Sequence, residues 1–522
     1  MTGVWRLIRL YVLTSWSLLV GPALALAGLV VATASGVKGL YPTAEAKRMY
    51  AATMGASPAG WAFNGRGVDL TTIGGIAAYE VGFIGQLLIP VVGLLLGIGL
   101  TRRLEEAGVI DLVTSGRVAR TAVPIAALIV GTGSWVMFAK VSEAGLYALG
   151  FDRLGCQAYP SILALYGMAF TGVGLLAGQL AQGSRGAYVL GAVLVVAGFV
   201  GRAYVDGRQL RQTWISPMSW VAEAHPWGTW VWWPALSFLG LEAVAVAVAL
   251  AIAGRRDLGS GVLPQRLGRG TASASLGTPA GLAWRLTRGA TFGWTAVAVI
   301  WCTSIGLMAD EMGRIIRDNP TLAAALGDDP SQVVSVMSLV ITGILAGATG
   351  IAVISRFGAE EQAARIGLAL AGAVSRLRMW LVWSGIAVTS ALATLLSGAL
   401  ALGVAQWVSG GSRATLGREL RAAGAYTAPV VLVTVVAGLL VAVSPRLRSV
   451  AWLPLGWFAV VGLMAEALRL PRWSRDLSPY ELVGRVPLEP LDRTAWVWLV
   501  FAATVECAAA TVRFGSRSLV RG

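Results

Sequence analysis

Charged residues are scarce in this chain of 522 residues: Asp, Glu, Lys and Arg together make up 13%, while hydrophobic residues make up 56%. Cysteine and histidine are scarcer still, with Cys156, Cys302 and Cys507 far apart and one histidine, His225. Scattered thiols predict neither a disulfide framework nor a metal site. With one histidine, the chain lacks the parts of a zinc hydrolase, a Ser-His-Asp triad or a haem site. Neither catalysis nor a bound cofactor is therefore expected of the chain itself.

The dipeptide Gly-Lys is also absent, which excludes the phosphate-binding loop G-x-x-x-x-G-K-[ST]. Any ATP used together with this chain would have to be bound, with Mg²⁺, by another polypeptide. The formal net charge of +15 does not imply a nucleic-acid partner, because Lys and Arg that flank membrane spans give a basic balance through topology alone.

Long hydrophobic runs are what the sequence has in abundance. The mean hydropathy of +0.71 and the 21 tryptophans lie outside the range of soluble globular domains. A helix needs about 20 mostly apolar residues to cross a bilayer. The sequence therefore predicts an all-α polytopic membrane protein with about 12 spans, at 10–33, 75–99, 123–142, 160–181, 187–205, 231–253, 289–308, 332–354, 379–404, 425–443, 450–468 and 495–512.

The distribution of charge predicts an orientation. Lys and Arg are retained on the cytoplasmic side of a membrane, whereas acidic residues matter little. With both termini inside, the inner loops hold the larger share of the basic residues and the smaller share of the acidic ones. We therefore expect a multi-pass protein of the cell membrane with both termini in the cytoplasm.

Four local matches recur in the same order along the chain, each at the same place relative to the predicted spans. They indicate two parallel six-helix copies. The matches are WRLIR at 5–9 with WRLTR at 284–288, GRVAR at 116–120 with GAVSR at 372–376, SPMSWV at 216–221 with SPYELV at 478–483, and WVW at 230–232 with 496–498. The predicted domains are a first transmembrane domain at 1–253, a flexible cytoplasmic linker at 254–283 and a second transmembrane domain at 284–522.

The loop between the second and third spans is unusually charged. It reads RRLEEAGVIDLVTSGRVAR at 102–120, and its copy reads SRFGAEEQAARIGLALAGAVSR at 355–376. Each has a Glu pair, then apolar residues, then Gly and Arg. Carboxylates near a helix N-terminus and arginines near its C-terminus offset the macrodipole, and Gly often ends a helix. We expect a short amphipathic helix of about three turns in each loop, lying on the membrane surface or in a groove of a partner. The alternative is a solvated connector.

At this loop the chain resembles a known family. The Glu pair entering GVIDLVTSGRVAR is similar to the E-E-x-G-x-[LI]-[DE]-L-L-x-S-x-P-V-S-R region of ABC-2-type exporter permeases. The fused duplication and the WRLIR opening look most like the actinobacterial polyketide-antibiotic (tetronasin-type) exporter permeases, which include multidrug efflux members. The resemblance covers essentially the whole chain. It implies that each half is one ABC-2 (type V exporter-like) transmembrane domain, and that two copies of a separately encoded ABC ATPase serve one chain.

The resemblance also implies site residues, assigned by matching position. Coupling helices that contact the ATPase would contain Glu105, Glu106, Asp111, Arg117 and Arg120 in the first half, and Glu360, Glu361, Arg365 and Arg376 in the second. Elbow helices along the inner membrane surface would contain Trp5, Arg6 and Arg9, and Trp284, Arg285 and Arg288. The sequence departs from the family pattern in two places. Arg117 and Ala373 replace its Pro, and its acidic position is Asp111 in the first half but Gly367 in the second, so the second element is the more degenerate.

Four carboxylates fall inside the predicted spans: Glu80, Glu242, Glu466 and Glu506. Each would cost a few kcal/mol at mid-bilayer if it faced lipid, so each is expected to face the bundle, water or a partner. Two interpretations remain open. The carboxylates lie near helix ends or bond to Ser, Thr or Trp within the bundle, or some of them line a route for cationic or amphiphilic substrates.

The sequence thus predicts the permease subunit of an ATP-driven exporter that moves hydrophobic or amphipathic compounds, such as antibiotics, drugs or lipids, out of the cytoplasm or inner leaflet. A proton-coupled major-facilitator antiporter also has twelve helices in parallel repeats, but would carry a compact G-x-x-x-D-[RK]-x-G-[RK]-[RK] loop between its second and third helices. A membrane-embedded lipid-processing enzyme is a third candidate, for which the shortage of His leaves little chemistry.

Overall fold

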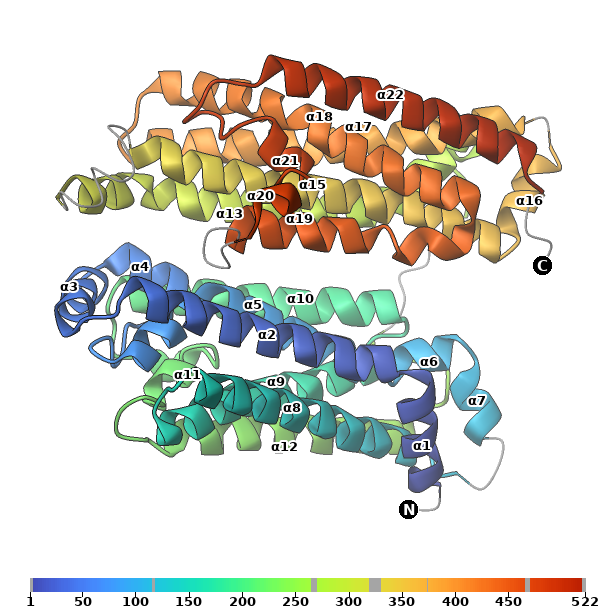
Figure 1. Cartoon of the computed structure of the whole chain (residues 1–522). Coiled ribbons are helices and arrows are strands. Elements are labelled where there is room, and N and C mark those ends of the chain that lie inside the picture. The colour runs from blue at the N-terminus through green and yellow to red at the C-terminus, as the bar shows by residue number, and fades with distance from the viewer. Residues whose placement is uncertain are drawn as a thin grey trace. The chain divides into compact units, whose positions relative to one another are not determined.

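The computed structural model describes residues 3–114, 118–263, 270–318, 330–372, 374–464 and 470–518. Its regular structure is helical, and within these ranges the β-structure is one isolated bridge between Ala181 and Leu263. The chain divides into two compact units, Met1–Gly268 and Arg269–Gly522, which are coloured blue to green and yellow to red in Figure 1.

Unit 1 contains six helices that are long and apolar enough to cross a membrane: α2 (Trp16–Leu40), α5 (Ile73–Gly99), α8 (Ala122–Ala148), α9 (Arg153–Leu180), α10 (Ser184–Gly207) and α12 (Trp233–Arg255). Its short helices are α1 (Val4–Thr14), α3 (Ala44–Met54), α4 (Pro58–Asn64), α6 (Arg102–Glu106), α7 (Val109–Thr114), η1 (Thr213–Ile215) and α11 (Trp220–Glu223). We call the end of the unit with α1, α6 and α7 the basal end and the end with α3, α4 and α11 the apical end (Figure 1).

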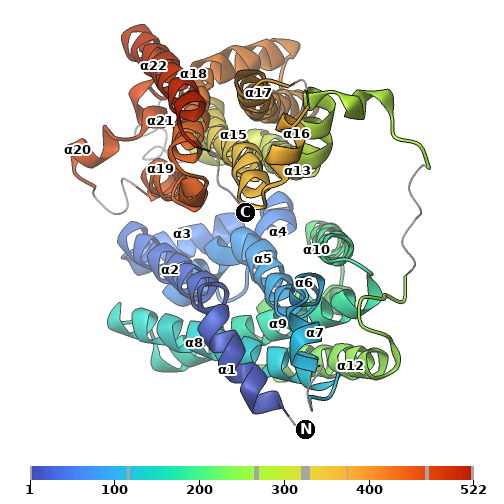
Figure 2. The ribbon, with the colours of Figure 1, turned by 90° about the vertical axis from the view of Figure 1, so that its right-hand side faces the viewer.

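Unit 2 contains five such long helices among its described residues: α13 (Pro279–Asp318), α15 (Pro330–Gln362), α17 (Arg376–Val408), α18 (Arg413–Val443) and α22 (Arg493–Ser516). Its short helices are η2 (Ala274–Gly277), α16 (Arg365–Leu370), η3 (Pro445–Ser449), α19 (Trp452–Met464), α20 (Arg472–Arg475) and α21 (Pro479–Leu482). The basal end of this unit is the one with α16, where the described chain ends after α22 (Figure 2).

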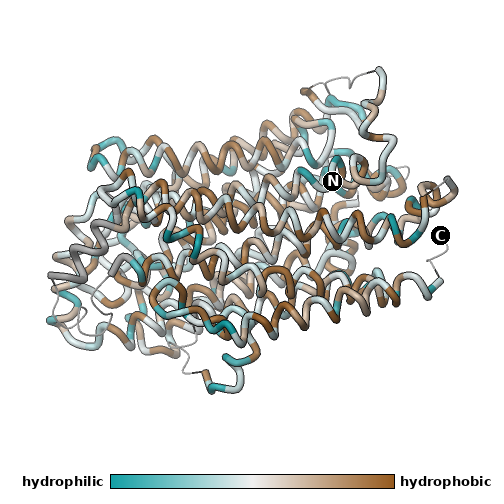
Figure 3. The backbone as a smooth tube through the Cα atoms, turned by 90° about the horizontal axis from the view of Figure 1, so that it is seen from above, coloured by the Kyte–Doolittle hydropathy of each residue, from teal (hydrophilic) through white to brown (hydrophobic). Residues whose placement is uncertain are grey.

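The expected fold class is confirmed: the chain is an all-α polytopic membrane protein, with 11 candidate spans among the described residues. Hydrophobic residues run along the long helices, and hydrophilic residues gather towards their ends and in the loops (Figure 3). Of the expected span at 450–468, the structure describes α19 as far as Met464. Residues 465–469, and with them the candidate Glu466, lie outside the described part of the chain.

The two units share one packing pattern. In unit 1, α5 packs against α2, α9 and α10, while α9 also packs against α8 and α12. In unit 2, α15 packs against α13, α18 and α19, while α18 also packs against α17 and α22. These contacts join equivalent helices in the same chain order in the two units, which is the arrangement that a duplicated six-helix element produces.

The beginnings of the two units differ. WRLIR lies in α1, a separate helix that ends at Thr14, whereas WRLTR lies inside α13, which runs unbroken from Pro279. The expected elbow segment is therefore a separate helix in unit 1, whereas among the described residues of unit 2 it is part of a long helix. The Trp and Arg side chains of both segments are exposed. The linker expected at 254–283 is shorter at both ends, because α12 runs to Arg255 and α13 begins at Pro279.

Glycines allow α5 and α9 to approach closely. A Cβ atom on Gly97 would lie 2.4 Å from the carbonyl oxygen of Thr171 and 2.6 Å from the backbone nitrogen of Leu175. Small residues are favoured where membrane helices pack backbone to backbone. Since both neighbouring atoms belong to the backbone of α9, even one methyl group would push the two helices apart.

We expect the Gly97→Ala substitution to lower the free energy of unfolding by about 1–3 kcal/mol, the usual cost of overpacking a close-packed site. The measurement is the melting temperature of the detergent-solubilised chain. Gly240→Ala is the matched control, since a Cβ there meets no atom within 4 Å. Equal melting temperatures for the two variants would show that the α5–α9 contact is looser than described.

Candidate coupling site at the basal end of each unit

The charged loop after the second span is not the single three-turn helix expected. In unit 1, Gly108 separates α6 from α7 with a φ of +73°, and in unit 2, Ala364 separates α15 from α16 with a φ of +56°. A residue in the left-handed region commonly ends a helix. The Glu pairs therefore lie at the C-terminal end of the preceding helix, and the expectation that they open the amphipathic helix is wrong.

The two short helices α7 and α16 present the same side chains. Ile110 and Ile366 turn inwards, with exposed fractions of 1% and 5%. Two residues later, Leu112 and Leu368 are each 79% exposed. The two isoleucines and the two leucines are each 256 residues apart, so each unit has an apolar anchor and an exposed leucine at one equivalent place.

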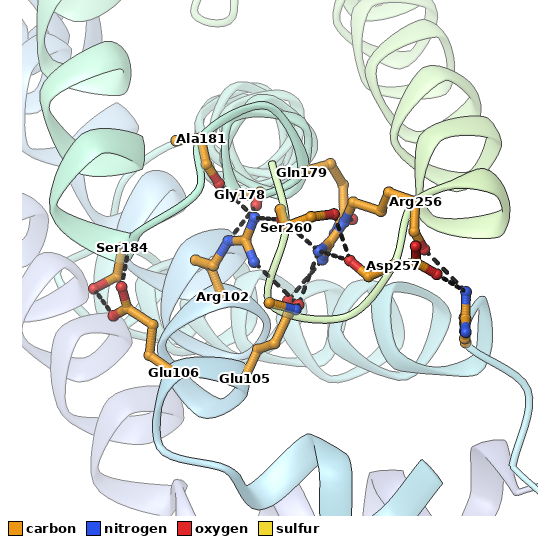
Figure 4. Close-up of polar contacts among 12 residues, drawn as sticks. Arg102, Glu105, Glu106, Gly178, Gln179, Ala181, Ser184, Arg256, Asp257 and Ser260 are labelled. Carbon is orange, nitrogen blue, oxygen red and sulfur yellow. Dashed lines mark hydrogen bonds and ion pairs between the residues drawn. The ribbon is translucent and has the colours of Figure 1, made fainter. Parts of the chain in front are cut away.

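Glu105, in α6, is bound by the arginine that directly follows α12. Its carboxylate accepts two parallel hydrogen bonds from Arg256, with Nη1–Oε1 at 2.8 Å and Nη2–Oε2 at 2.6 Å (Figure 4). The backbone N–H of Gly259 donates to the same Oε1 at 2.7 Å, and Nη1 of Arg102 lies 3.0 Å from it. Bidentate pairing of this kind fixes geometry as well as charge. Glu105 is 8% exposed, so its carboxylate is bonded within the chain and not presented to a partner.

The guanidinium groups around Glu105 also bind the end of α9 and the start of the linker. Arg102 donates from Nε to the carbonyl of Gly178 at 3.0 Å, and from Nη2 to the carbonyls of Ala181 and Ser260. Arg256 donates from Nε to the side-chain oxygen of Gln179 at 2.5 Å. The ends of three helices, α6, α9 and α12, are thus joined through one buried charge cluster (Figure 4).

Unit 2 repeats the pairing. Glu361, 2% exposed, accepts two hydrogen bonds from Arg517, with Nη1–Oε1 at 2.6 Å and Nη2–Oε2 at 2.8 Å. Arg517 directly follows α22, as Arg256 follows α12, and the backbone angles agree, at φ −82° and ψ 155° against φ −84° and ψ 153°. Its Nε donates to the carbonyl of Ala442 in α18 at 2.5 Å, where Arg256 uses the side chain of Gln179.

A second arginine completes each cluster. Nη1 of Arg120 donates to the carbonyl of Arg256 at 3.1 Å, and Nη1 of Arg376 donates to the carbonyl of Arg517 at 3.3 Å. Arg120 comes just before α8, and Arg376 is the first residue of α17. We call the Glu105–Arg256–Arg120 group and the Glu361–Arg517–Arg376 group the Glu–Arg ties. By its place in the tie, Glu105 thus corresponds to Glu361. Aligning the two Glu pairs in sequence order instead matches Glu105 with Glu360, one residue away.

The remaining predicted site residues lie near the ties but do not share one role. Glu106 accepts hydrogen bonds from the backbone N–H of Ser184 at 2.8 Å and from its hydroxyl, and so caps the N-terminus of α10. Glu360 pairs with Arg356 at 2.7 Å and with Arg365 at 2.5 Å.

Two further predicted residues lie on or beside α7. Asp111 is exposed on α7, at the position that Gly367 occupies in α16. Arg117 lies outside the described residues.

The carboxylates expected within the spans are not brought together. Glu80 of α5 accepts a hydrogen bond from the hydroxyl of Tyr50 in α3, at the apical end. Glu242 and Glu506 lie half-buried in α12 and α22, and Oε2 of Glu506 is buried without a hydrogen-bond partner among the described residues. The described residues also contain no group of three or more His, Cys, Asp or Glu that could hold a metal ion.

Sequence reasoning missed the two arginines that complete the ties. Arg256 lies in GRRD at 254–257 and Arg517 in GSRS at 515–518, and both follow the last long helix of their unit. The shared G-x-R pattern at that place was the available signal. The pattern alone does not reveal the pairing, because the carboxylate that each arginine binds lies about 150 residues earlier in the chain.

Comparison with known proteins places these observations in a family. A family model described as "Multidrug efflux system permease Rv1217c, C-terminal domain" matches residues 276–515, within unit 2. The chain is also 31% identical, over 516 residues, to the multidrug efflux system permease protein Rv1217c of Mycobacterium tuberculosis (strain ATCC 25618 / H37Rv). That similarity covers 96% of this chain and 92% of the relative, so it includes both units.

Removing the carboxylate of one tie should destabilise the chain. In the Glu105→Ala variant, Arg102 and Arg256 keep their charges at a buried site without the carboxylate, and breaking a buried pair in this way costs about 3–5 kcal/mol. The measurement is the melting temperature of the purified chain. The control is Glu143→Ala, which removes the partially exposed pair of Glu143 with Lys140 and should cost at most about 1 kcal/mol. A Glu105→Ala variant as stable as this control would contradict the structural role of the tie.

Proposed function

This chain belongs to the family of multidrug efflux permeases represented by Rv1217c, and we propose that it is the membrane subunit of an ATP-driven ABC exporter. In this proposal, two copies of a separately encoded ATPase bind the basal ends of the two units, which face the cytoplasm together with both termini. ATP and Mg²⁺ are held by the ATPase copies. The chain supplies the route for hydrophobic or amphipathic compounds, consistent with the multidrug efflux named for its relative.

The observation that carries the proposal is the exposed leucine on each short basal helix. A single exposed leucine is common on protein surfaces. Leu112 and Leu368, however, have the same exposed fraction at equivalent positions, and each lies two residues after a buried isoleucine. A short helix that is held by a buried apolar residue on one side and exposes an apolar residue on the other fits a groove on a partner. Two equivalent helices fit two copies of the same partner, which supports a stoichiometry of two ATPase subunits per chain.

The Glu–Arg ties support a route for the mechanical signal. Two residues separate α6 from α7, and the tie joins α6 to the end of α12 through Glu105 and Arg256. In unit 2, Glu361 and Arg517 join the end of α15 to α22. A displacement of α7 or α16 by an ATPase would therefore act directly on the last long helix of its unit, as well as on the helix that precedes the loop.

The two basal sites are similar but not equal, which favours unequal coupling. Asp111 on α7 is replaced by Gly367 on α16. Arg102, which joins the first tie to α9 and to the linker, corresponds to Gly358, which has no side chain. Among the described residues, the tie of unit 2 therefore lacks the bonds that Arg102 makes, although Arg517 still binds α18, and the ATPase copy on α7 is expected to be the more strongly coupled.

The exposed side of α5 supports an amphipathic substrate. Glu80, Ile84, Leu88 and Val91 are exposed at helical spacing, so a carboxylate stands at the apical end of an apolar stripe. A route of this kind suits a molecule with an apolar body and a cationic or polar group. Glu242 and Glu506 remain further candidates for contact with substrate.

Replacing either exposed leucine by Glu should weaken ATPase binding without affecting membrane insertion. We expect the Leu112→Glu and Leu368→Glu variants each to retain at most about half of the copurifying ATPase, and the double variant to retain almost none. The reason is that a charge placed in an apolar groove remains unpaired after desolvation. The measurement is the molar ratio of ATPase to permease after affinity purification, together with ATP-dependent dye efflux from reconstituted vesicles.

The matched control is Leu154→Glu, because Leu154 is 75% exposed at the apical end of unit 1, away from α7. That variant should copurify with the ATPase as the unchanged chain does. Full copurification and efflux with the Leu112→Glu/Leu368→Glu chain would contradict docking at α7 and α16. Undiminished transport by the unchanged chain with no ATPase present would contradict the proposed function as a whole.

A further inference from the structure

A pocket lies at the apical end of unit 1, away from the Glu–Arg tie. The empty space among its lining residues is about 550 Å³, open solvent at its mouth included. Its walls come from the end of α4 and the loop after it, the first halves of α5 and α9, and α11 with the loop that follows it. Four aromatic side chains line it: Tyr79, Tyr159, Tyr166 and Trp227.

Glycines hold the walls of this pocket in place. The ring of Trp227 lies between α5 and α9, where a Cβ on Gly74 or Gly155 would come within 2.1 Å or 2.0 Å of it. Trp227 also contacts the ring of Tyr159, at a centroid distance of 5.9 Å. The aromatic part of the pocket is thus built from rings that cannot move far without displacing a helix.

Among the lining residues, Oε1 of Gln86, Oδ2 of Asp69 and Nε1 of Trp227 are buried without a hydrogen-bond partner in the described part of the chain. Gln86 is 8% exposed, and its Nε2 donates to the carbonyl of Asn64 at 3.0 Å, which fixes the orientation of the amide. Buried polar groups are normally bonded, and one left unpaired costs about 1–3 kcal/mol. The two oxygens can only accept hydrogen bonds, so a bound group that donates would satisfy them.

The charges around the pocket favour a cation. Arg66 pairs with Asp206 at 3.1 Å and with Glu223 at 3.8 Å, and Arg202 pairs with Asp206 at 3.7 Å. The positive charges of these two guanidinium groups are thus balanced by the two carboxylates with which they pair. Nδ1 of His225 lies 3.5 Å from Oδ1 of Asp69, a contact that is an ion pair only when the imidazole is protonated and that leaves the buried Oδ2 of Asp69 open to a further donor.

We propose that this pocket binds a small organic ammonium ion with an aromatic body. The ammonium group donates hydrogen bonds to Oδ2 of Asp69 and Oε1 of Gln86, and the aromatic body packs against the tyrosines and Trp227, whose faces also attract a cation. The site deepens the proposed function by naming a substrate class. That the ligand is an exported compound rests on the proposed function. Binding of the ligand, in contrast, requires only this chain.

Unit 2 has a pocket at the corresponding place with different chemistry. Its polar lining is Arg475, Glu481 and Arg485, and Glu481 pairs with Arg475 at 3.2 Å. The hydroxyl of its Tyr426 donates to a backbone carbonyl at 3.2 Å, and the position of Gln86 is taken by Thr342. Of its described lining residues, none has a buried polar atom without a partner. The structure therefore assigns one ammonium site to each chain.

The test measures binding of radiolabelled tryptamine, a protonated aromatic amine at neutral pH, to the purified full-length chain in lipid nanodiscs without any ATPase. We expect saturable binding of one tryptamine per chain, displaced by unlabelled tryptamine but at least tenfold less well by neutral 3-ethylindole. Asp69→Asn should weaken binding at least tenfold. Ala78→Leu, which fills the pocket from α5, should abolish it. Glu481→Gln, the matched carboxylate change in the pocket of unit 2, should leave binding unchanged.

A melting temperature recorded for each variant identifies loss of binding through unfolding, and Asp69→Asn and Ala78→Leu change the site in independent ways. Tryptamine binding that survives both substitutions overturns the proposal, as does an equal loss with Glu481→Gln or equal displacement by 3-ethylindole. No saturable binding to the folded chain at millimolar tryptamine would mean a pocket filled by solvent only and also overturns it. A chain that binds tryptamine but never associates with an ATPase would contradict the export mechanism and leave the site intact.

Discussion

The basal architecture of both units depends on one interaction, the bidentate pair between a buried glutamate and the arginine that follows the last long helix. Glu105 with Arg256, and Glu361 with Arg517, bring together chain segments about 150 residues apart. A buried charge is tolerated only when it is paired and hydrogen-bonded. The helices that meet at each tie must therefore end at fixed places, and the short helices α7 and α16 are positioned from those ends.

This constraint connects the fold to the proposed transport cycle. In each unit, the tie joins the helix before the charged loop to the last long helix, and a second arginine joins the helix after the loop to the same point. In the proposed cycle, movement applied at the loop would thus reach three long helices at once. The apical pocket of unit 1 lies at the other end of α5 and α9, two of the helices whose basal ends surround the first tie. In unit 1, the proposed docking element and the proposed ligand site thus lie at opposite ends of the same helices.

Much of this arrangement could be predicted from the sequence. Hydropathy located eleven of the spans, because a membrane helix is a local property of about 20 residues. The repeated loop located the basal sites, but not their geometry. The left-handed residues Gly108 and Ala364 divide each loop, and the partners Arg256 and Arg517 are distant in the chain, so local periodicity showed neither the break nor the ties. The pocket residues Asp69, Gln86 and Trp227 come from three segments that only the packing of α5 against α9 brings together.

The most direct test of the ties is a double-mutant cycle on the one in unit 2, measured in the complex reconstituted with its ATPase. The quantity is the amount of dye exported per ATP hydrolysed by the Glu361→Arg, Arg517→Glu and doubly exchanged chains. If the tie transmits movement, each single exchange lowers this ratio severalfold and the double exchange restores most of it, with a coupling energy of about 0.5–3 kcal/mol. A double exchange that performs no better than the worse single variant would contradict the account.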